Sequence, residues 1–258
     1  MQNQRGEPLV LVEAVEGGVV IRLNRPEKRN AVNDPLAAAA IAAIDAAEAD
    51  DAVRSIVLTG SGQAFCAGQD MGEATGRVER NASVAGAGGA GGLAARLGRC
   101  EKPVIAAING FCMGGGAVVA LNCDIRFASD DATFRFPGAG YGLVVAASLL
   151  PAAIGQAKAK DLILTGRTVG ATEACEMGLV NRVVGRDGLD ALALEYVRMI
   201  AANSPKAVRA SKHVMNLAAL DHGAIGQELE YNRQLRGGDD HVARFGAAAD
   251  RVVGPAKA

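Results

Sequence analysis

The sequence has no tryptophan, few aromatic residues and no excess of either charge. Aromatic residues make up 3% of the 258 residues, whereas hydrophobic residues make up 50%. A chain of this length can bury a sizeable core, as one large α/β domain or as a core with an appendage. The net charge of −1 and the absence of a basic tract argue against nucleic acid or an anionic membrane surface as a partner.

Cysteine and histidine are also scarce, and their spacing fits no common metal motif. The five cysteines lack any paired metal-ligand spacing, and the three histidines all lie in the C-terminal region. We therefore expect no metal site and reduced, mostly buried thiols. The N-terminus lacks the charged-then-apolar pattern of an export signal, so we expect a cytoplasmic protein.

The segment Lys102–Ala120 carries the clearest pattern of apolar residues and glycines in the sequence, and three interpretations of it are possible. Its apolar run breaks at Asn109-Gly110 and then passes Gly114–Gly116 into a second apolar run, which predicts a buried strand, a sharp turn and a helix. A membrane span is disfavoured by Asn109, Asn122 and the glycines. A purely structural crossover remains open. The third interpretation is an anion site, because glycines let unpaired N–H groups approach a ligand closely.

A second small-residue turn follows another predicted strand. Residues 55–59 read as a buried strand, and a glycine in the segment Phe65–Met71 precedes a residue whose N–H could be exposed. Turns after two successive strands place donors together at the strand ends, where open α/β folds bind ligands. The sequence before them predicts a hairpin from 9–15 and 19–23 and a helix starting at Asp34-Pro35, with the aspartate as cap.

A polar, basic loop lies between the hairpin and this helix. It is either a solvated connection or the partner of an anionic ligand. On the second interpretation, the phosphate-binding side chains are Arg25, Lys28 and Arg29.

Five motifs in series resemble the crotonase, or enoyl-CoA hydratase/isomerase, superfamily over roughly residues 8–200. They occupy residues 24–31 (N-R-P-x-x-x-N-A), 65–70 (F-C-A-G-x-D), 102–116 (K-P-V-I-A-A-I-N-G-x-x-x-G-G-G), 123–126 (C-D-I-R) and 164–184 (L-T-G-R…A-x-E-A…G-L-V-N-R-V-V). The resemblance implies an α/β fold, a spiral of ββα units in residues 1–195. It also implies a C-terminal helical trimerisation region in residues 196–258.

The resemblance further implies a ligand and a site. Crotonase-like proteins bind acyl-CoA thioesters and stabilise an enolate on the thioester oxygen with two backbone N–H groups, which by position are those of Gln69 and Gly115. Coenzyme A arrives with the substrate, so no separate cofactor is expected, and the assembly would be a homotrimer or a dimer of trimers. Further substrate contacts by position are Ala67, Asp70, Met71, Gly114, Val118 and Gly138.

The acid–base groups of the hydratases are absent at the positions where the resemblance places them. One glutamate would follow the triple glycine by two residues, and Val118 stands there. The other would follow Pro137, where Gly138 stands. Valine and glycine can neither deprotonate water nor protonate Cα. The remaining polar candidates are Tyr141 and Ser148, with Asp70 and Glu73 near the first donor. Tyr141 is either a functional phenol or an amphipathic wall residue.

Two further patterns invite a functional interpretation. Cys66 and Cys112 neighbour the expected donors, but inert buried thiols are favoured over nucleophiles because no histidine lies nearby in sequence. Residues 86–91 match the dinucleotide pattern G-x-G-x-x-G literally, yet no strand precedes them and no acidic residue follows at the required distance. We instead expect residues 84–92 to form a mobile loop that acts as a lid over the acyl pocket.

The C-terminal part predicts helices over residues 156–164 and 171–177, another after Asp190, and one from Ser204-Pro205. Their apolar stripes favour an oligomer interface over packing within one chain. Two functions are then open. The first is a crotonase-type lyase or isomerase of fatty acid metabolism that stabilises an enolate with weak or absent hydratase activity. The alternative is a catalytically silent acyl-CoA binding or carrier protein.

Overall fold

The computed structural model describes residues 2–72, 88–219 and 221–253, and it has the predicted α/β architecture. Ten strands form two sheets in this part of the chain. The six-stranded sheet has the order β1 (Val10–Val15), β2 (Gly18–Leu23), β3 (Ser55–Gly60), β5 (Val104–Ile108), β7 (Ile125–Ser129), β10 (Arg182–Val184). The four-stranded sheet has the order β4 (Ala64–Cys66), β6 (Phe111–Met113), β8 (Thr133–Arg135), β9 (Thr168–Gly170).

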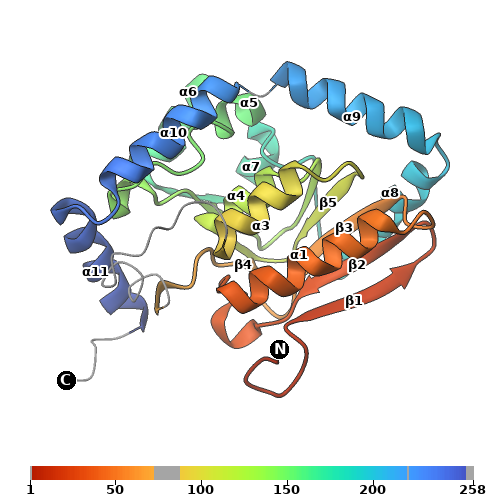
Figure 1. Ribbon diagram of the computed structural model, residues 1–258, viewed down its shortest axis with the longest axis horizontal. Coiled ribbons are helices and arrows are strands. Elements are labelled where there is room, and N and C mark those ends of the chain that lie inside the picture. The colour runs from red at the N-terminus through yellow and green to blue at the C-terminus, as the bar shows by residue number, and fades with distance from the viewer. Residues whose placement is uncertain (1, 73–87, 220, 254–258) are drawn as a thin grey trace.

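Helices cover the sheets and continue beyond them (Figure 1). The α-helices are α1 (Asp34–Ala49), α3 (Gly89–Gly98), α4 (Gly115–Leu121), α5 (Leu150–Ile154), α6 (Gln156–Thr165), α7 (Ala171–Met177), α8 (Leu189–Ala201), α9 (Pro205–Ala219), α10 (His222–Leu235) and α11 (Asp239–Val253). Short 3-10 turns are η1 (Pro26–Lys28), η2 (Ala139–Tyr141) and η3 (Arg186–Gly188). The helices predicted over 156–164 and 171–177 are α6 and α7.

Repeated strand pairs explain the spiral. β3 and β4, β5 and β6, and β7 and β8 each place one strand in the large sheet and the next in the small one. Within the large sheet, β2, β3, β5, β7 and β10 run parallel, and β1 pairs antiparallel with β2 as the predicted hairpin. Buried strands such as β5 need no alternation of polar and apolar residues because both faces of a parallel sheet are covered.

Three local predictions are wrong. The segment after Asn109-Gly110 forms β6 before it reaches α4, because Phe111–Met113 pairs with β4 and β8. The cap of α1 is Asn33, whose Oδ1 accepts from the N–H of Leu36 at 3.0 Å, so Asp34 is the first helical residue.

The glycine-rich segment gives the third correction. Residues 89–92, expected in a mobile loop, form the first turn of α3, and residues 84–87 lie outside the described residues. Glycine is a poor helix former, but Ala90, Leu93 and Leu97 are buried, and α3 packs between α1 and α4. Tertiary packing therefore overrides the local preference of the chain.

A buried ion pair fastens α9 to the core. Nζ of Lys212 donates to Oδ2 of Asp124 at 2.7 Å and to the carbonyl of Lys102 at 2.9 Å, and the same Oδ2 accepts from the N–H of Val104 at 2.7 Å. Lys212 is 7% exposed. Its ammonium thus serves the junction between α9 and the start of β5.

Replacing Lys212 with methionine keeps an unbranched side chain but removes the ammonium. We expect the free energy of unfolding to fall by about 2–3 kcal/mol, because Asp124 remains partly buried without its cation. Urea denaturation measures the change. Lys206→Met, an exposed position on the same helix, is the control and should change stability by less than about 0.5 kcal/mol. Equal effects of the two substitutions would contradict the assigned role.

Candidate active site

Two backbone N–H groups lie side by side where β4 and α4 meet. A Cβ built on Gly115, the first residue of α4, would lie 3.3 Å from the backbone nitrogen of Gln69. Neither N–H has an acceptor among residues 2–72, 88–219 and 221–253. Unpaired donors at such a junction are available to a ligand oxygen. The structure thus brings together the two positions that the sequence singled out.

Backbone hydrogen bonds hold the loop that carries Gln69. The N–H of Val32 donates to the carbonyl of Gly68 at 2.7 Å, and the N–H of Asp70 donates to the carbonyl of Val32 at 3.0 Å. On the other side, the N–H of Ala67 donates to the carbonyl of Arg29 at 3.0 Å. These bonds engage the neighbours of Gln69 and leave its own N–H free of them. Ala67 and Met71 of the same loop are partly exposed.

The three basic residues of the loop before α1 are placed differently from one another. Arg25 is turned inward, with Nη1 2.5 Å from Oδ2 of Asp70 and 3.0 Å from the carbonyl of Ala31. Lys28 and Arg29 are exposed, and the guanidinium of Arg29 lies 5.0 Å from the ring centre of Phe111. Arg25 therefore braces the loop of Gln69, while contact with a phosphate stays a prediction for all three.

Val118 lies on the partly open side of α4. Gly114, Gly115 and Val118 are partly exposed, whereas Ala117 and Val119 are buried. Residues at helical positions i and i+3 share one face, so Val118 lies one turn beyond Gly115 on its side of the helix. An apolar side chain thus occupies the position where the resemblance places the first glutamate.

Gly138 is buried, and the space for a side chain there is already filled. A Cβ at this position would lie 2.7 Å from Cβ of Val145 and 3.0 Å from the carbonyl of Leu143. The preceding Pro137 lies near the start of α4, because a Cβ on Gly114 would come within 3.8 Å of its Cγ. The second glutamate position therefore borders α4, but Val145 fills it in place of an anion or a longer side chain.

The sequence interpretation missed a histidine beside Tyr141. His241 of α11 is 2% exposed, and its Nδ1 lies 2.8 Å from the carbonyl oxygen of Tyr141. A carbonyl only accepts, so Nδ1 carries the proton and donates it. The ring of Phe245 lies 6.1 Å from that of Tyr141 and 5.4 Å from that of His241. No local sequence signal could have shown this contact across 100 positions.

Helix α10 holds the segment that follows Tyr141. The side chain of Asn232 accepts from the N–H of Val144 at 3.1 Å and donates to its carbonyl at 2.6 Å. Oε2 of Glu228 accepts from the N–H of Ser148 at 2.7 Å. The segment from residue 138 to 148 is therefore held by helices that come almost last in the chain.

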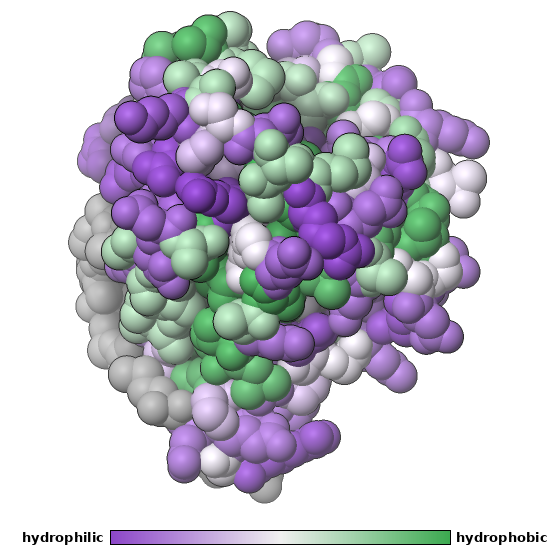
Figure 2. Space-filling view, turned by 90° about the vertical axis from the view of Figure 1, so that its right-hand side faces the viewer, coloured by the Kyte–Doolittle hydropathy of each residue, from purple (hydrophilic) through white to green (hydrophobic). Residues whose placement is uncertain are grey.

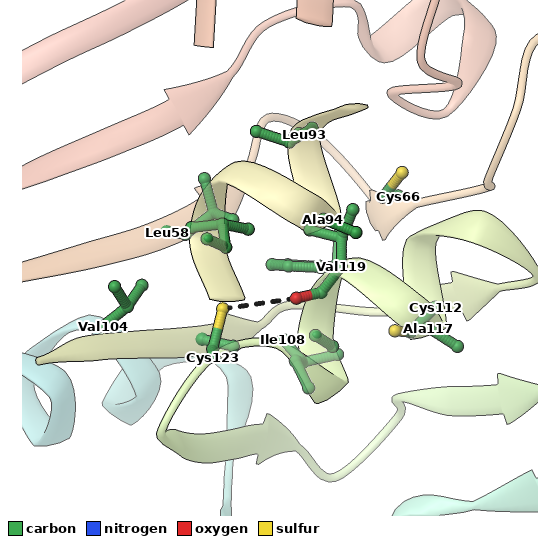
Figure 3. Close-up of a cluster of buried hydrophobic side chains, with 14 of the residues drawn as sticks. Leu58, Cys66, Leu93, Ala94, Val104, Ile108, Cys112, Ala117, Val119 and Cys123 are labelled. Atoms are coloured by element: carbon green, nitrogen blue, oxygen red, sulfur yellow. Dashed lines mark hydrogen bonds between the residues drawn. The ribbon is translucent and has the colours of Figure 1, made fainter. Parts of the chain in front are cut away.

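The buried cysteines belong to the hydrophobic core. Cys66, Cys112 and Cys123 are members of a buried cluster that also contains Leu58 and Val119, and Sγ of Cys123 donates to the carbonyl of Val119 at 3.5 Å (Figure 3). Burial raises the pKa of Cys66 and of Cys123 to about 12, and it raises the pKa of Cys112 well above its ordinary value. Such thiols stay protonated near neutral pH, which makes them poor nucleophiles.

The raised pKa values predict a loss of stability in alkali. Unfolded thiols ionise near pH 9, whereas folded Cys66 and Cys123 ionise near pH 12. The stabilisation is full below pH 9 and is lost as the pH rises toward 12, by about 1.4 kcal/mol per pH unit for each thiol. Chemical denaturation from pH 8 to 11 measures the free energy of unfolding, which should fall less steeply with pH in Cys66→Ala than in wild type. Cys175→Ala, at a half-buried position, is the matched control, and identical slopes in all three proteins would refute the assignment.

No group of three or more acidic, cysteine or histidine side chains in the described parts of the chain could hold a metal ion. In the same parts, no helix combines the length and hydropathy of a membrane span.

The fold and the donor pair define a class of α/β proteins that present two backbone N–H groups at a strand–helix junction, and comparisons specify the family. Residues 13–240 match the family model described as enoyl-CoA hydratase/isomerase. A short-chain-enoyl-CoA hydratase of Clostridium acetobutylicum is 38% identical over 80% of each chain. A mevalonyl-coenzyme A hydratase of Aspergillus fumigatus is 38% identical over 74% of this chain and 72% of its own.

A solved structure agrees with these sequence matches. An enoyl-CoA hydratase/isomerase from Xanthobacter autotrophicus superposes with a TM-score of 0.82 at 34% identity, over 95% of this chain and 94% of its own. The chain therefore belongs to the enoyl-CoA hydratase/isomerase family of the crotonase superfamily.

Proposed function

We propose that this protein binds an acyl-CoA thioester and stabilises the enolate of its acyl group without the usual pair of glutamates. The adjacent, unpaired N–H groups of Gln69 and Gly115 carry the proposal. Charge that develops on the thioester oxygen would receive both donors, and one well-aimed donor lowers a barrier by roughly 2.7–4 kcal/mol. Coenzyme A would arrive as part of the substrate, with no separate cofactor.

The surroundings of the donors argue against ordinary hydration. Addition of water to an enoyl thioester needs one group to deprotonate water and another to protonate Cα. Val118 has no proton to exchange, and Val145 fills the space beside Gly138. The proton in our proposal comes from Tyr141, from bound water or from the substrate itself. The reaction classes that remain are isomerisation and other chemistry through an enolate.

A catalytically silent acyl-CoA carrier is the second candidate. The pair of N–H groups and the lack of a carboxylate at positions 118 and 138 favour this candidate too, because a site with donors and no acid–base pair can bind a thioester without turning it over. The two candidates differ in one measurable property. Only an enolate-forming protein exchanges the α-protons of a bound acyl-CoA with solvent.

We also propose that the protein works as a homotrimer. Figure 2 shows the face that lies on the right in Figure 1, on the side of α8 and α9. Apolar residues gather in the middle of this face. In one chain, α8 and α9 leave Met199, Val214, Met215 and Leu217 exposed. Helices α10 and α11, which lie on the left in Figure 1, leave Leu229, Tyr231, Leu235 and Val242 exposed. Apolar surface of this kind marks an interaction site.

The donor pair can be tested with Gly115→Ala. The new methyl group would lie 2.7 Å from Cβ of Ala90 and 3.3 Å from the nitrogen of Gln69, so the two donors must separate. We expect acyl-CoA affinity, measured by calorimetry, to fall up to about tenfold, because one hydrogen bond to the neutral thioester oxygen contributes about 0.5–1.5 kcal/mol. Gly91→Ala in α3, where a Cβ meets nothing within 4 Å, is the control and should bind like wild type. Unchanged affinity in Gly115→Ala would rule out this donor.

The effect of the missing carboxylates on hydration can be tested by introducing glutamates at their positions. Wild type should hydrate crotonyl-CoA far more slowly than ordinary hydratases do, and Val118→Glu with Gly138→Glu should raise the rate only when Val145→Ala makes room. Each acid–base group supplies roughly 10²–10⁴-fold. Deuterium exchange at Cα, followed by mass spectrometry, separates the two candidates in wild type. Wild-type turnover within tenfold of ordinary hydratases would overturn the proposed lack of an acid–base pair.

A further inference from the structure

The side chain of Gln69 carries a buried donor for which the described residues supply no acceptor. Its Nε2 is buried and has no hydrogen-bond partner in the described parts of the chain. Buried amide groups in folded proteins nearly always have partners. This amide belongs to the same residue whose backbone N–H forms half of the donor pair, so covalent geometry keeps it beside the site.

The orientation of this amide is fixed by α3. Oε1 of Gln69 accepts from the N–H of Ala90 at 2.9 Å. That N–H can only donate, so the oxygen must face Ala90 and the NH₂ group must face away. A flipped amide would place two donors against each other. The first turn of α3 thereby determines which atom of Gln69 is offered to a ligand.

Close packing holds the amide in this position. Gly89 has φ +60°, and a Cβ there would lie 2.1 Å from Oε1 and 2.7 Å from Nε2 of Gln69. Ala90 in turn lies against the other donor, since a Cβ on Gly115 would come within 2.7 Å of its own Cβ. Figure 1 shows α3 and α4 side by side, as their packing requires. The amide therefore lies between the start of α3 and the two backbone donors.

An unpaired NH₂ group at this place selects for an acceptor on the ligand. A saturated acyl chain would leave the donor unpaired, and sites with buried polar groups reject analogues that lack the matching atom. A carbonyl oxygen is a pure acceptor and suits it best. Resting on the proposed function, we propose that Nε2 of Gln69 is a specificity-determining donor for acyl-CoA thioesters that carry a carbonyl oxygen on C3.

The test compares acetoacetyl-CoA with butyryl-CoA, which have equal chain length and differ in the C3 oxygen. Affinities are measured by calorimetry for wild type, Gln69→Met and Gln69→Glu. The glutamate keeps an oxygen for the N–H of Ala90 and removes the donor, but it also adds a negative charge that lowers the affinity for both ligands. The preference between the two ligands in Gln69→Glu therefore remains informative if Gln69→Met fails to fold. We expect wild type to prefer acetoacetyl-CoA by about tenfold or more over the preference of either variant.

Each outcome has a distinct meaning. A loss of the preference for acetoacetyl-CoA in Gln69→Glu and in Gln69→Met supports the proposal. A preference that is the same in all three proteins overturns it. An equal loss of affinity for both ligands in the uncharged Gln69→Met also overturns it, because the amide would then contact a part of the ligand that they share. Failure of wild type to bind either thioester would instead refute the proposed function.

Discussion

The close contact between the loop after β4 and the first turn of α4 is the constraint on which the site depends. A Cβ on Gly116 would lie 2.2 Å from the carbonyl oxygen of Cys66, and one on Gly68 would lie 2.8 Å from that of Met113. Only glycine permits this approach of one backbone to another. The contact brings the N–H groups of Gln69 and Gly115 together. The spiral of strand pairs supports it, because β4 and β6 are parallel neighbours in the small sheet.

A second layer of control comes from helices that follow the core in sequence. His241 and Asn232 form hydrogen bonds with the backbone of Tyr141 and Val144. Lys212 joins α9 to the start of β5. The C-terminal helices thus shape the site of their own chain and still leave apolar side chains exposed. An oligomer that covers these side chains would hold residues 138–148 more firmly.

The chemistry of the site follows from what surrounds the donors. Val118 and Val145 make the neighbourhood apolar at both positions where hydratases of this superfamily carry glutamates. A low dielectric strengthens the hydrogen bonds that two N–H groups make to a developing oxyanion. Neither Val118 nor Val145 can activate water. Under the proposed function, binding and enolate stabilisation are separated from hydration, and the proposed role of the Gln69 amide would add a means of selection.

The fold class and the family follow from the amino-acid sequence alone, which also singles out Gln69 and Gly115 as the expected donors. Glycines and β-branched runs carry local information, and the motifs from 24–31 to 164–184 appear in a characteristic order. The residues at the two positions where the resemblance places glutamates, Val118 and Gly138, are likewise read from the sequence. Strand β6 was missed because three residues carry too little pattern, and the first turn of α3 was missed because burial of Leu93 outweighs the poor propensity of glycine.

The residues that lie opposite each of these positions become known only from the folded chain. It showed that Val145 fills the space at Gly138, that Arg25 braces Asp70, and that His241 reaches Tyr141. It also showed that Ala90 orients the amide of Gln69. These contacts join residues distant in sequence, and a sequence pattern records the preferences of neighbours. The partner of a buried polar group is set by packing, which no local pattern encodes.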